Sequence, residues 1–535
     1  MVRSAVPTVT ELLLARATDP RPGLIADERR WSWARYVSEC ADRAALLQRL
    51  HRDGPFHIGV LLDNVAEYAF LLGAAALSGA VLVGLNTSRR GDQLARDVRL
   101  SHCQVVITDS RYVELLDDLD LGAATGRVMD ADSASWHVQV AARAGSRLDP
   151  VPAAGGDLLM LAFTSGTTAE PRAVRISHQH VALSGQIVTD RCGLSSEDVI
   201  YLSMPLFHIS TITGGWAAGL ACGATVALRN RFSAATFIDD VRAVGATYTT
   251  YVGHPLCAVL ATPPRPDDAD NTLRLVVGTE AAERDVIRFR ERFDCQVYDG
   301  YCATEGGVLL SHPGNAPPGA IGRLHGEVEL RHERTGRPVP PAAFNADGRL
   351  LNAEDAIGEL VNTAGAGAFA GYYQDPDANG RRLRDGRFHS GDLAYRDEEG
   401  FVYFVDRADD WLLVDGEHLA VGPIERILLR HPDIADVAVY AVPDAQQQTD
   451  QVMAAVVLRA GVVFDPAAFA DFLAAQRDLG PRQVPRFVRV ARRLPKTATF
   501  KVIRRTLATQ GLRSVDPVWG RDGALLRYER IATNA

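Results

Sequence analysis

The feature that most constrains the fold is an alternation of short apolar runs with segments of helical periodicity. Apolar runs rich in β-branched residues occur at 57–64, 80–87 and 103–110, and helical segments such as 65–79 separate them. Alternation of this kind is typical of a parallel sheet covered by helices. It resumes in the second half of the large domain, with strand candidates at 198–207, 224–230, 246–252, 273–278 and 295–301. The sequence therefore predicts an α/β fold with two doubly wound sheets.

The rest of the chain has a different character. From about residue 316, Gly- and Pro-rich segments with short strand patterns predict a small, mostly β subdomain. A last unit, residues 408–535, has the order helix, strand, strand, helix, strand, which indicates a separate α+β domain. We therefore expect an N-terminal domain over residues 1–407, with the β subdomain at about 316–407, and a small mobile C-terminal domain.

Composition excludes several classes of protein. The net charge of -9 argues against a nucleic-acid partner. Seven cysteines without a CxxC pair favour a reducing cytoplasm over a disulfide framework or a zinc site. Residues 68–85 are uncharged, but their Ala and Gly content and the change to VLVGL favour a buried helix followed by a buried strand over a membrane span. The N-terminus does not resemble a secretory signal, so we expect a cytoplasmic protein.

The stretch FTSGTTAEPRAVRISH, residues 163–178, is the first candidate for a binding site. It follows the apolar strand candidate LLMLAF and precedes a helix that begins near His178. Small residues let the backbone approach a ligand, and their hydroxyl and N–H groups can surround phosphate oxygens. The stretch lacks the GxxxxGK[ST] pattern. On this feature alone, a phosphate loop and an ordinary polar turn both remain open.

Three further segments favour the phosphate loop. YDGYCATEGG, residues 298–307, places a flexible turn beside an aromatic ring and a carboxylate, a combination suited to a base and to magnesium. Residues 388–425 supply Asp392, which can accept from ribose hydroxyls, and Arg407, which can contact a phosphate or a ribose. LPKTATFKVIRRTL, residues 494–507, places Lys501 in a loop where an ammonium can meet developing negative charge.

Lysine usage supports a chemical role for Lys501. Lysine occurs only at positions 496 and 501 among the 57 basic residues, so this chain uses arginine wherever arginine is tolerated. A lysine that remains is therefore suspected of being chemically required. For Lys496 the sequence offers no role beyond a solvated surface charge.

In this order and spacing, these segments resemble the adenylate-forming superfamily of acyl-CoA synthetases, adenylation domains and luciferases. The resemblance covers nearly the whole chain. The details YCATEG, GDLAYRDEEGFVYFVDR and TFK are most similar to the very-long-chain acyl-CoA synthetases and the actinobacterial fatty-acyl ligases. The resemblance implies that ATP and a carboxylate form an acyl-adenylate and pyrophosphate. The C-terminal domain then rotates, and coenzyme A attacks the adenylate.

The resemblance also implies roles for individual residues, carried over position by position. Catalytic roles fall to Lys501, Thr304 and Glu305: the ammonium stabilises the transition state, Thr304 binds the α-phosphate and Glu305 binds Mg²⁺. The β- and γ-phosphates are expected at Thr164, Ser165, Gly166, Thr167 and Thr168; adenine at Gly278, Asp299, Gly300 and Tyr301; ribose at Asp392 and Arg407; the acid at His208, Ile209 and Gly253; and the hinge at Asp409.

Three positions depart from the family pattern, and two alternatives stay open. Ala169 stands where Gly is usual, Arg172 where Lys is usual, and Leu413 at a position that is often basic. They permit a diazotase of secondary-metabolite (antibiotic) biosynthesis, which activates nitrite with ATP and diazotises an arylamine. A degenerate nucleotide-binding scaffold is the other alternative, against which the retained site residues argue. The expected partners are a small-molecule acid, or nitrite and an arylamine, and a second copy of the chain in a homodimer.

Overall fold

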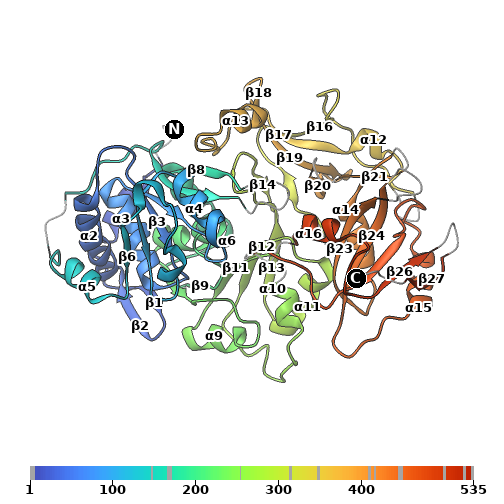
Figure 1. Ribbon diagram of the computed structural model, residues 1–535, viewed down its shortest axis with the longest axis horizontal. Helices are drawn as coiled ribbons and strands as arrows, with labels where there is room; N and C mark the ends of the chain where they lie inside the picture. Colours follow the sequence, from blue (N-terminus) through green and yellow to red (C-terminus); the bar gives the residue numbers. More distant parts are fainter. Residues whose placement is uncertain are drawn as a thin grey trace.

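The computed structural model describes most of the chain. The described residues are 6–145, 149–164, 171–253, 255–312, 316–317, 319–345, 350–407, 411–414, 417–443, 450–497, 502–521 and 526–531. No helix among them is both long enough and apolar enough to cross a membrane. In Figure 1 the large N-terminal unit occupies the left and centre of the view, and the C-terminal elements lie at the right.

The first sheet confirms the predicted alternation. Its six strands have the order β6-β5-β3-β4-β7-β8, and neighbours are parallel except β7 and β8. The uncharged run at 68–85 forms most of helix α3 (Ala66–Ser78) and all of β4, and both are buried. The strands are β3 (His57–Leu61), β4 (Val81–Gly84), β5 (Cys103–Thr108), β6 (Val128–Asp130), β7 (Leu158–Phe163) and β8 (Ala173–Ser177).

The second sheet contains the later strand candidates and a hairpin that the sequence did not reveal. Its order is β13-β12-β11-β9-β10-β1-β2, so the N-terminal hairpin extends a sheet formed mainly by residues 199–300. The hairpin joins because β1 pairs in parallel with β10, a long-range contact without a local signature. The strands are β1 (Pro22–Ala26), β2 (Arg29–Ser32), β9 (Val199–Leu202), β10 (Thr225–Leu228), β11 (Tyr248–Val252), β12 (Leu275–Thr279) and β13 (Gln296–Gly300).

Helices connect the strands and join the two sheets through one apolar core. That core includes residues of β3, β4, β9 and β10 together with α2, α3, α6 and α8. Helix α3 is apolar on every side, as a helix inside such a core must be. The helices are α1 (Val9–Ala15), α2 (Trp33–Leu50), α4 (Gly91–Leu100), α5 (Ala134–Ala141), α6 (His178–Cys192), α8 (Ala217–Cys222), α9 (Phe237–Val244), α10 (Pro255–Leu260) and α11 (Glu283–Phe293).

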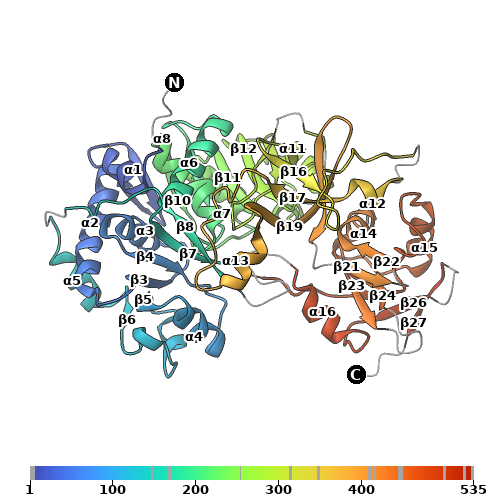
Figure 2. The same cartoon turned by 90° about the horizontal axis from the view of Figure 1, so that it is seen from above.

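The β subdomain is an antiparallel sheet with the order β14-β15-β20-β19-β17-β16, and β18 also pairs with β19. Helix α13 (Pro376–Arg382) lies beside the ends of β7 and β8 in Figure 2, and an isolated bridge from Val174 to Tyr372 links the same regions. The other elements are β14 (Leu310–Ser311), β15 (Gly322–Leu324), β16 (Val328–Arg331), α12 (Ala353–Ala356), β17 (Gly358–Asn362), β18 (Leu383–Arg384), β19 (Arg387–Arg396) and β20 (Phe401–Arg407).

The C-terminal unit has its own sheet and its own apolar core, as the change of pattern predicted. The predicted helices and strands are present, but the hairpin of β21 (Trp411–Val414) and β22 (Glu417–Ala420) was missed. So were helix α16 (Arg504–Gln510) and the last two strands. The other elements are α14 (Val421–Leu428), β23 (Ile434–Pro443), β24 (Asp450–Leu458), α15 (Pro466–Ala475), β25 (Phe487–Val490), β26 (Val518–Arg521) and β27 (Tyr528–Ile531).

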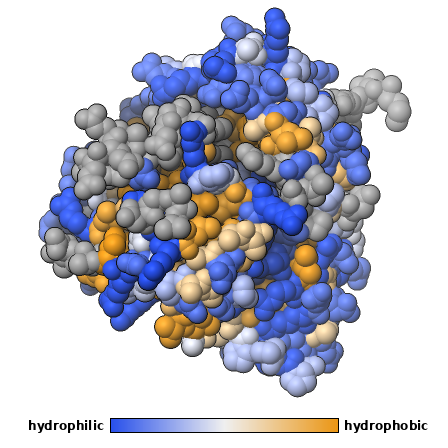
Figure 3. Space-filling model, turned by 90° about the vertical axis from the view of Figure 1, so that its right-hand side faces the viewer, coloured by the Kyte–Doolittle hydropathy of each residue, from blue (hydrophilic) through white to orange (hydrophobic). Residues whose placement is uncertain are grey.

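Figure 3 shows the side of the molecule that carries the C-terminal elements. That face is largely hydrophilic, with hydrophobic atoms gathered near its middle. The large exposed apolar side chains of the described chain are scattered through many elements, and single exposed apolar residues are normal for a protein surface. The homodimer stays a prediction.

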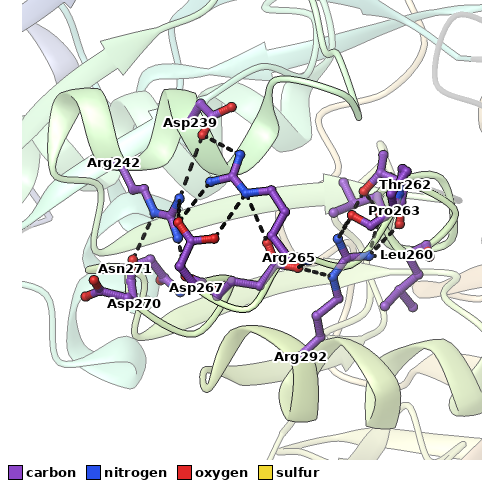
Figure 4. A network of polar contacts seen from close by, with 12 residues as sticks. Asp239, Arg242, Leu260, Thr262, Pro263, Arg265, Asp267, Asp270, Asn271 and Arg292 are labelled. Atoms are coloured by element: carbon purple, nitrogen blue, oxygen red, sulfur yellow. Dashed lines mark hydrogen bonds and ion pairs between the residues drawn. The ribbon is translucent and has the colours of Figure 1, made fainter.

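Arginine–carboxylate contacts hold the segment between α10 and β12 in place (Figure 4). Arg265 donates to Asp239 at 2.8 Å, and Arg292 of α11 donates to Asp268 at 2.7 Å. Arg292 also donates to backbone carbonyls at 259, 260, 262 and 263. Bidentate and networked guanidinium contacts hold geometry better than isolated ion pairs. Helix α11 is therefore anchored to the large unit at its C-terminal end.

A buried asparagine joins the two halves of the large unit. Asn64, three positions after the end of β3, donates from Nδ2 to the carbonyl of Met204 at 2.8 Å and accepts from the N–H of Leu206 at 2.8 Å. Only 3% of Asn64 is exposed, so both backbone groups depend on it for a hydrogen bond. Asn64 thus fixes the segment that leads to His208.

We predict that Asn64→Ala lowers the free energy of unfolding by about 2–4 kcal/mol, because it leaves a buried carbonyl and a buried N–H unpaired. Urea unfolding followed by fluorescence measures the change. The control is Asn86→Ala, which removes only local contacts to Ser88 and is expected to have a much smaller effect. Equal effects of the two substitutions would contradict the role of Asn64.

Candidate functional site

Three parallel strands end together at one edge of the second sheet. In register, Gly278 of β12 lies between Tyr251 of β11 and Asp299 of β13, and Thr279 lies beside Gly300. Gly253 follows β11 with a φ of 75° and donates its N–H to the carbonyl of Thr279 at 2.9 Å. The carboxyl ends of parallel strands are where α/β proteins bind ligands. The sheet therefore brings Gly253, Gly278, Asp299 and Gly300 together.

Asp299 is held by two donors at this edge. Its Oδ2 accepts from the Tyr251 hydroxyl at 2.5 Å and from the N–H of Ala281 at 2.8 Å. Burial raises the pKa of Asp299 to about 7, although both hydrogen bonds favour the carboxylate. Gly278 makes this arrangement possible, because a Cβ at that position would lie 2.4 Å from the Tyr251 ring and from its carbonyl oxygen.

Tyr301, two positions after Asp299, links the edge of the sheet to the β subdomain. The Tyr301 hydroxyl donates to Oδ2 of Asp392 at 2.5 Å. Asp392 lies in β19 directly opposite Arg407 of β20, so strand pairing brings the backbones of these two residues together. The side chain of Arg407 lies outside the described part. Asp392 and Arg407, the two residues predicted to contact ribose, are thus neighbours in the sheet, although 15 positions separate them in the chain.

Glu305 belongs to a polar cluster at the other end of this segment. Thr304 and Glu305 form a turn that is closed by the N–H of Gly306 donating to the carbonyl of Ala303 at 3.0 Å. Oε1 of Glu305 accepts from the Tyr372 hydroxyl at 2.7 Å, and Nε of Arg382 donates to the same hydroxyl at 3.1 Å. Burial and the Glu305 charge raise the pKa of Tyr372 to about 12, so this hydroxyl remains a donor.

The loop that follows β7 starts and ends beside the same cluster. Thr164 donates its N–H to the carbonyl of Arg172 at 2.9 Å, and its hydroxyl accepts from the N–H of Arg172 at 3.1 Å. The Arg172 guanidinium donates to Asp375 at 3.1 Å and lies 5.7 Å from the centre of the Tyr372 ring. Arg172 is therefore held by residues 372–375, the segment that also contacts Glu305. The sequence did not predict this contact.

The residues predicted to line the acid pocket lead into an irregular helix. His208 precedes the short helix α7 (Ile209–Thr211), Ile209 is buried, and a π-helical turn follows over Ile212–Trp216. The Tyr248 hydroxyl of β11 donates to the carbonyl of Gly214 at 3.0 Å, which attaches this turn to the strand that ends before Gly253. Single π-turns occur frequently at functional sites.

Several predicted positions lie outside the described residues. They are Ser165, Gly166, Thr167, Thr168 and Ala169 of the loop, the hinge residue Asp409, and Lys501. Leu413 lies in β21, but its side chain is outside the description.

The prediction for Lys496 was wrong. Its ammonium lies 2.6 Å from Oδ2 of Asp436, and only 22% of its side chain is exposed. A solvated surface lysine has water around its ammonium group, whereas Lys496 forms an ion pair with a carboxylate of β23. Asp436 lies 60 residues earlier in the chain, so no local pattern indicated the pair.

Sequence reasoning also missed Tyr251, Tyr372 and Arg382. The two tyrosines contact the predicted residues Asp299 and Glu305 from 48 and 67 positions away. Arg382 acts through Tyr372, whose hydroxyl accepts from it. The only local signal was the pair of tyrosines in GYYQDPD, residues 371–377, directly before a helix with proline in its first turn.

The described residues contain no group of three or more His, Cys, Asp or Glu side chains that could hold a metal ion by themselves. A separate pocket of about 340 Å³ lies in the β subdomain, between residues such as Arg323, Glu329 and Arg396. None of the predicted site residues lines it.

The pKa of Asp299 leads to a prediction about stability. Its pKa in the folded protein is about 7, above the ordinary value of 3.8, so between about pH 4 and pH 7 the folded protein holds a proton that the unfolded chain has released. The stability due to this group is therefore greatest at low pH and falls as the pH rises through that window.

We expect Asp299→Asn, which keeps an acceptor for both donors, to remove this fall. Relative to the wild type, its free energy of unfolding should rise by at least about 1 kcal/mol between about pH 5 and pH 8. Urea titrations across that range measure it, with Asp190→Asn at an exposed position as the control. Parallel pH profiles for the wild type and Asp299→Asn would refute the shifted pKa.

Comparison with known proteins shows the family of this chain. A family model described as AMP-binding enzyme matches residues 14–373, and a model of the AMP-binding enzyme C-terminal domain matches residues 423–501. The medium/long-chain-fatty-acid–CoA ligase FadD17 of Mycobacterium marinum is 46% identical over 96% of this chain and 99% of its own length. The steroid-22-oyl-CoA synthetase of Rhodococcus jostii is 45% identical over 96% of this chain and 92% of its own length.

Solved structures share the fold. The anthranilate CoA ligase AuaEII in complex with anthranoyl-AMP has a TM-score of 0.84 at 20% identity, over 95% of this chain and 98% of that one. ATP-bound MatB from Rhodopseudomonas palustris has a TM-score of 0.82 at 21% identity, over 94% of this chain and 99% of that one. The family models, the relatives and the fold agree with the resemblance seen in the sequence, and the chain belongs to the AMP-binding enzyme family.

Proposed function

We propose that this chain is an AMP-forming ligase that activates a hydrophobic carboxylic acid with ATP and transfers the acyl group to coenzyme A. The observation that carries the proposal is the path of residues 299–305. Within this short segment Asp299 lies at the edge of the sheet, Tyr301 contacts Asp392, and Glu305 contacts Tyr372. A nucleotide has its base, ribose and phosphates in the same order, so one segment can serve all three parts.

In this proposal the adenine base occupies the slot at the ends of β11, β12 and β13. Gly300 leaves room at the edge of the sheet, whereas the Tyr251 ring fills the space over Gly278 and closes one side of the slot. The Asp392 carboxylate would accept from the ribose hydroxyls, and the Arg407 guanidinium would donate to them. Tyr301 already holds one oxygen of Asp392, which keeps the carboxylate pointed at the site.

The phosphates and the magnesium ion would lie near Thr304 and Glu305. Mg²⁺ in nucleotide sites is usually held by one or two carboxylates and by the phosphates, so a single carboxylate suits it better than a complete cage. Oε1 of Glu305 is fixed by Tyr372, while Oε2 makes no hydrogen bond to the described chain and can face an ion. When bound, Mg²⁺ would offset phosphate charge. The 164–172 loop would hold the β- and γ-phosphates that leave as pyrophosphate, and Lys501 would stabilise the charge that develops as the carboxylate attacks the α-phosphate.

The acid substrate is inferred from the relatives. Those reported above are named as ligases of medium- and long-chain fatty acids and of a steroid side-chain acid, which share a large apolar body and a carboxylate. We infer the same class here, with His208, Ile209 and Gly253 near the carboxylate. The nitrite alternative receives no support from these relatives.

The remaining expectations belong to the same proposal. The C-terminal domain would begin at about 408 and turn at Asp409 to bring coenzyme A to the adenylate. All seven cysteines are free thiols, which supports a reducing cytoplasm as the place of action.

The first test is direct. Purified protein with ATP, Mg²⁺, coenzyme A and a panel of fatty and steroid acids should release AMP and pyrophosphate and form the acyl-CoA, as measured by mass spectrometry. ATP consumption that requires nitrite and an arylamine, with none for any carboxylic acid, would overturn the proposal.

A second prediction tests the adenine slot. Gly278→Ala should weaken ATP binding at least about tenfold, because the added methyl group meets backbone and ring atoms that cannot move away. Isothermal titration with a non-hydrolysable ATP analogue measures this affinity. Gly156→Ala is the matched control, since a Cβ there has nothing within 4 Å. Unchanged affinity in Gly278→Ala would place the nucleotide elsewhere.

A third prediction concerns Lys501. Lys501→Ala should slow acyl-adenylate formation by roughly 10²-fold or more while ATP binding changes little, because the ammonium acts on charge that develops in the transition state. Pyrophosphate exchange measures the first step. Lys496→Arg, which keeps a cation beside Asp436, is the control and should retain activity. Undiminished exchange in Lys501→Ala would refute the assignment.

A further inference from the structure

Helix α11 of the large unit contacts the C-terminal unit through one side chain. The guanidinium of Arg284, in the first turn of α11, donates to the backbone carbonyls of Leu429, His431 and Ile434. The distances to His431 and Ile434 are 3.3 Å and 2.7 Å. Figure 1 shows α11 adjoining the C-terminal elements.

The three acceptors lie where the C-terminal unit needs a donor. Leu429 and His431 follow the end of α14, and Ile434 begins β23. The last carbonyls of a helix lack partners within it, and the helix dipole makes that end negative. Arg284 therefore ties the segment from the end of α14 to the start of β23 to the large unit, and these contacts exist only while the two units keep this arrangement.

A second contact lies close by. The thiol of Cys257, in α10, donates to the carbonyl of Ala435 at 3.6 Å, so residues 429–435 contact the large unit at two places. Burial raises the pKa of Cys257 to about 11, which makes the thiol a poor nucleophile in this arrangement.

The helix that carries Arg284 is well placed to act as a fixed support. Its C-terminal end is anchored by Arg292 (Figure 4), and its N-terminal end follows the adenine slot directly. Ala281, whose N–H binds Asp299, is only three positions before Arg284. One short segment thus borders the nucleotide slot and holds the C-terminal unit.

We propose that Arg284 is a positioning residue that clasps the C-terminal unit to the large unit in one of the two arrangements used by the two half-reactions. The proposal rests on the proposed function for the existence of those half-reactions. Rotation of the C-terminal unit would separate the guanidinium from its three carbonyls. The clasp therefore shifts the equilibrium between the arrangement for adenylation and the arrangement for acyl transfer.

The structural test uses Cys257 as a reporter. In Arg284→Met, Cys257 should react with iodoacetamide at least about fivefold faster than in the wild type, measured by mass spectrometry, because opening of the interface exposes it. Arg288→Met is the matched control, since Arg288 is exposed on the same helix. Exposed Cys302 serves as the internal reference for labelling.

Buried Cys40 and Cys103 lie in the core of the large unit and should stay unlabelled, which separates release of the clasp from unfolding. If Arg284→Met folds poorly, Arg284→Lys, which keeps the charge but not the planar fork, provides the second variant. It should show an intermediate labelling rate. Labelling of Cys257 at the wild-type rate in a folded Arg284→Met protein would overturn the clasp.

The functional test measures the two half-reactions separately, by pyrophosphate exchange and by transfer from a preformed acyl-adenylate to coenzyme A. Their rate ratio should change at least about fivefold in Arg284→Met and stay constant in Arg288→Met. An unchanged ratio would refute the role in partitioning. If the wild type has no ligase activity, the proposed function fails, whereas the labelling of Cys257 still decides whether Arg284 holds the units together.

Discussion

The close contact between the Tyr251 ring and the backbone of Gly278 is the constraint on which the rest of the site depends. With no side chain at 278, the ring lies over the neighbouring strand and its hydroxyl reaches Asp299. Asp299 in turn accepts from the N–H of Ala281, which sets the start of α11. The absence of a Cβ at position 278 thus lets Tyr251 reach Asp299, the carboxyl group that also binds the segment directly before α11.

At the end of the site near Glu305, arginine side chains supply the positive charge and hold the neighbouring groups in place. Arg172, which replaces the usual lysine, is held by Asp375 and Tyr372, and Arg382 donates to the hydroxyl that holds Glu305. A planar guanidinium suits such fixed contacts better than an ammonium does. A chain with almost no lysine can therefore make these contacts with arginine, and the lysine at position 501 stands out from its composition.

The sequence predicted the sheets well and the contacts between distant segments poorly. The strands at 57–61, 81–84 and 103–108 have an unmistakable apolar pattern, because a strand buried on both faces must be apolar throughout. The N-terminal hairpin at 22–32 has no comparable pattern. Nothing in the sequence around β1 indicates that it pairs with β10. The error over Lys496 has the same cause: its partner Asp436 is chosen by the packing of the C-terminal sheet.

The sequence by itself determined the α/β class, the order of the units, the family and the identities of the candidate nucleotide-binding residues, because these depend on local periodicity and on short motifs. Only the tertiary structure decided that Tyr251 and Tyr372 hold Asp299 and Glu305, that Arg172 is held by Asp375, and that Arg284 donates to backbone carbonyls of the other unit. Such contacts join residues far apart in the chain. Their free energy comes from geometry that exists only after the sheets and helices have packed.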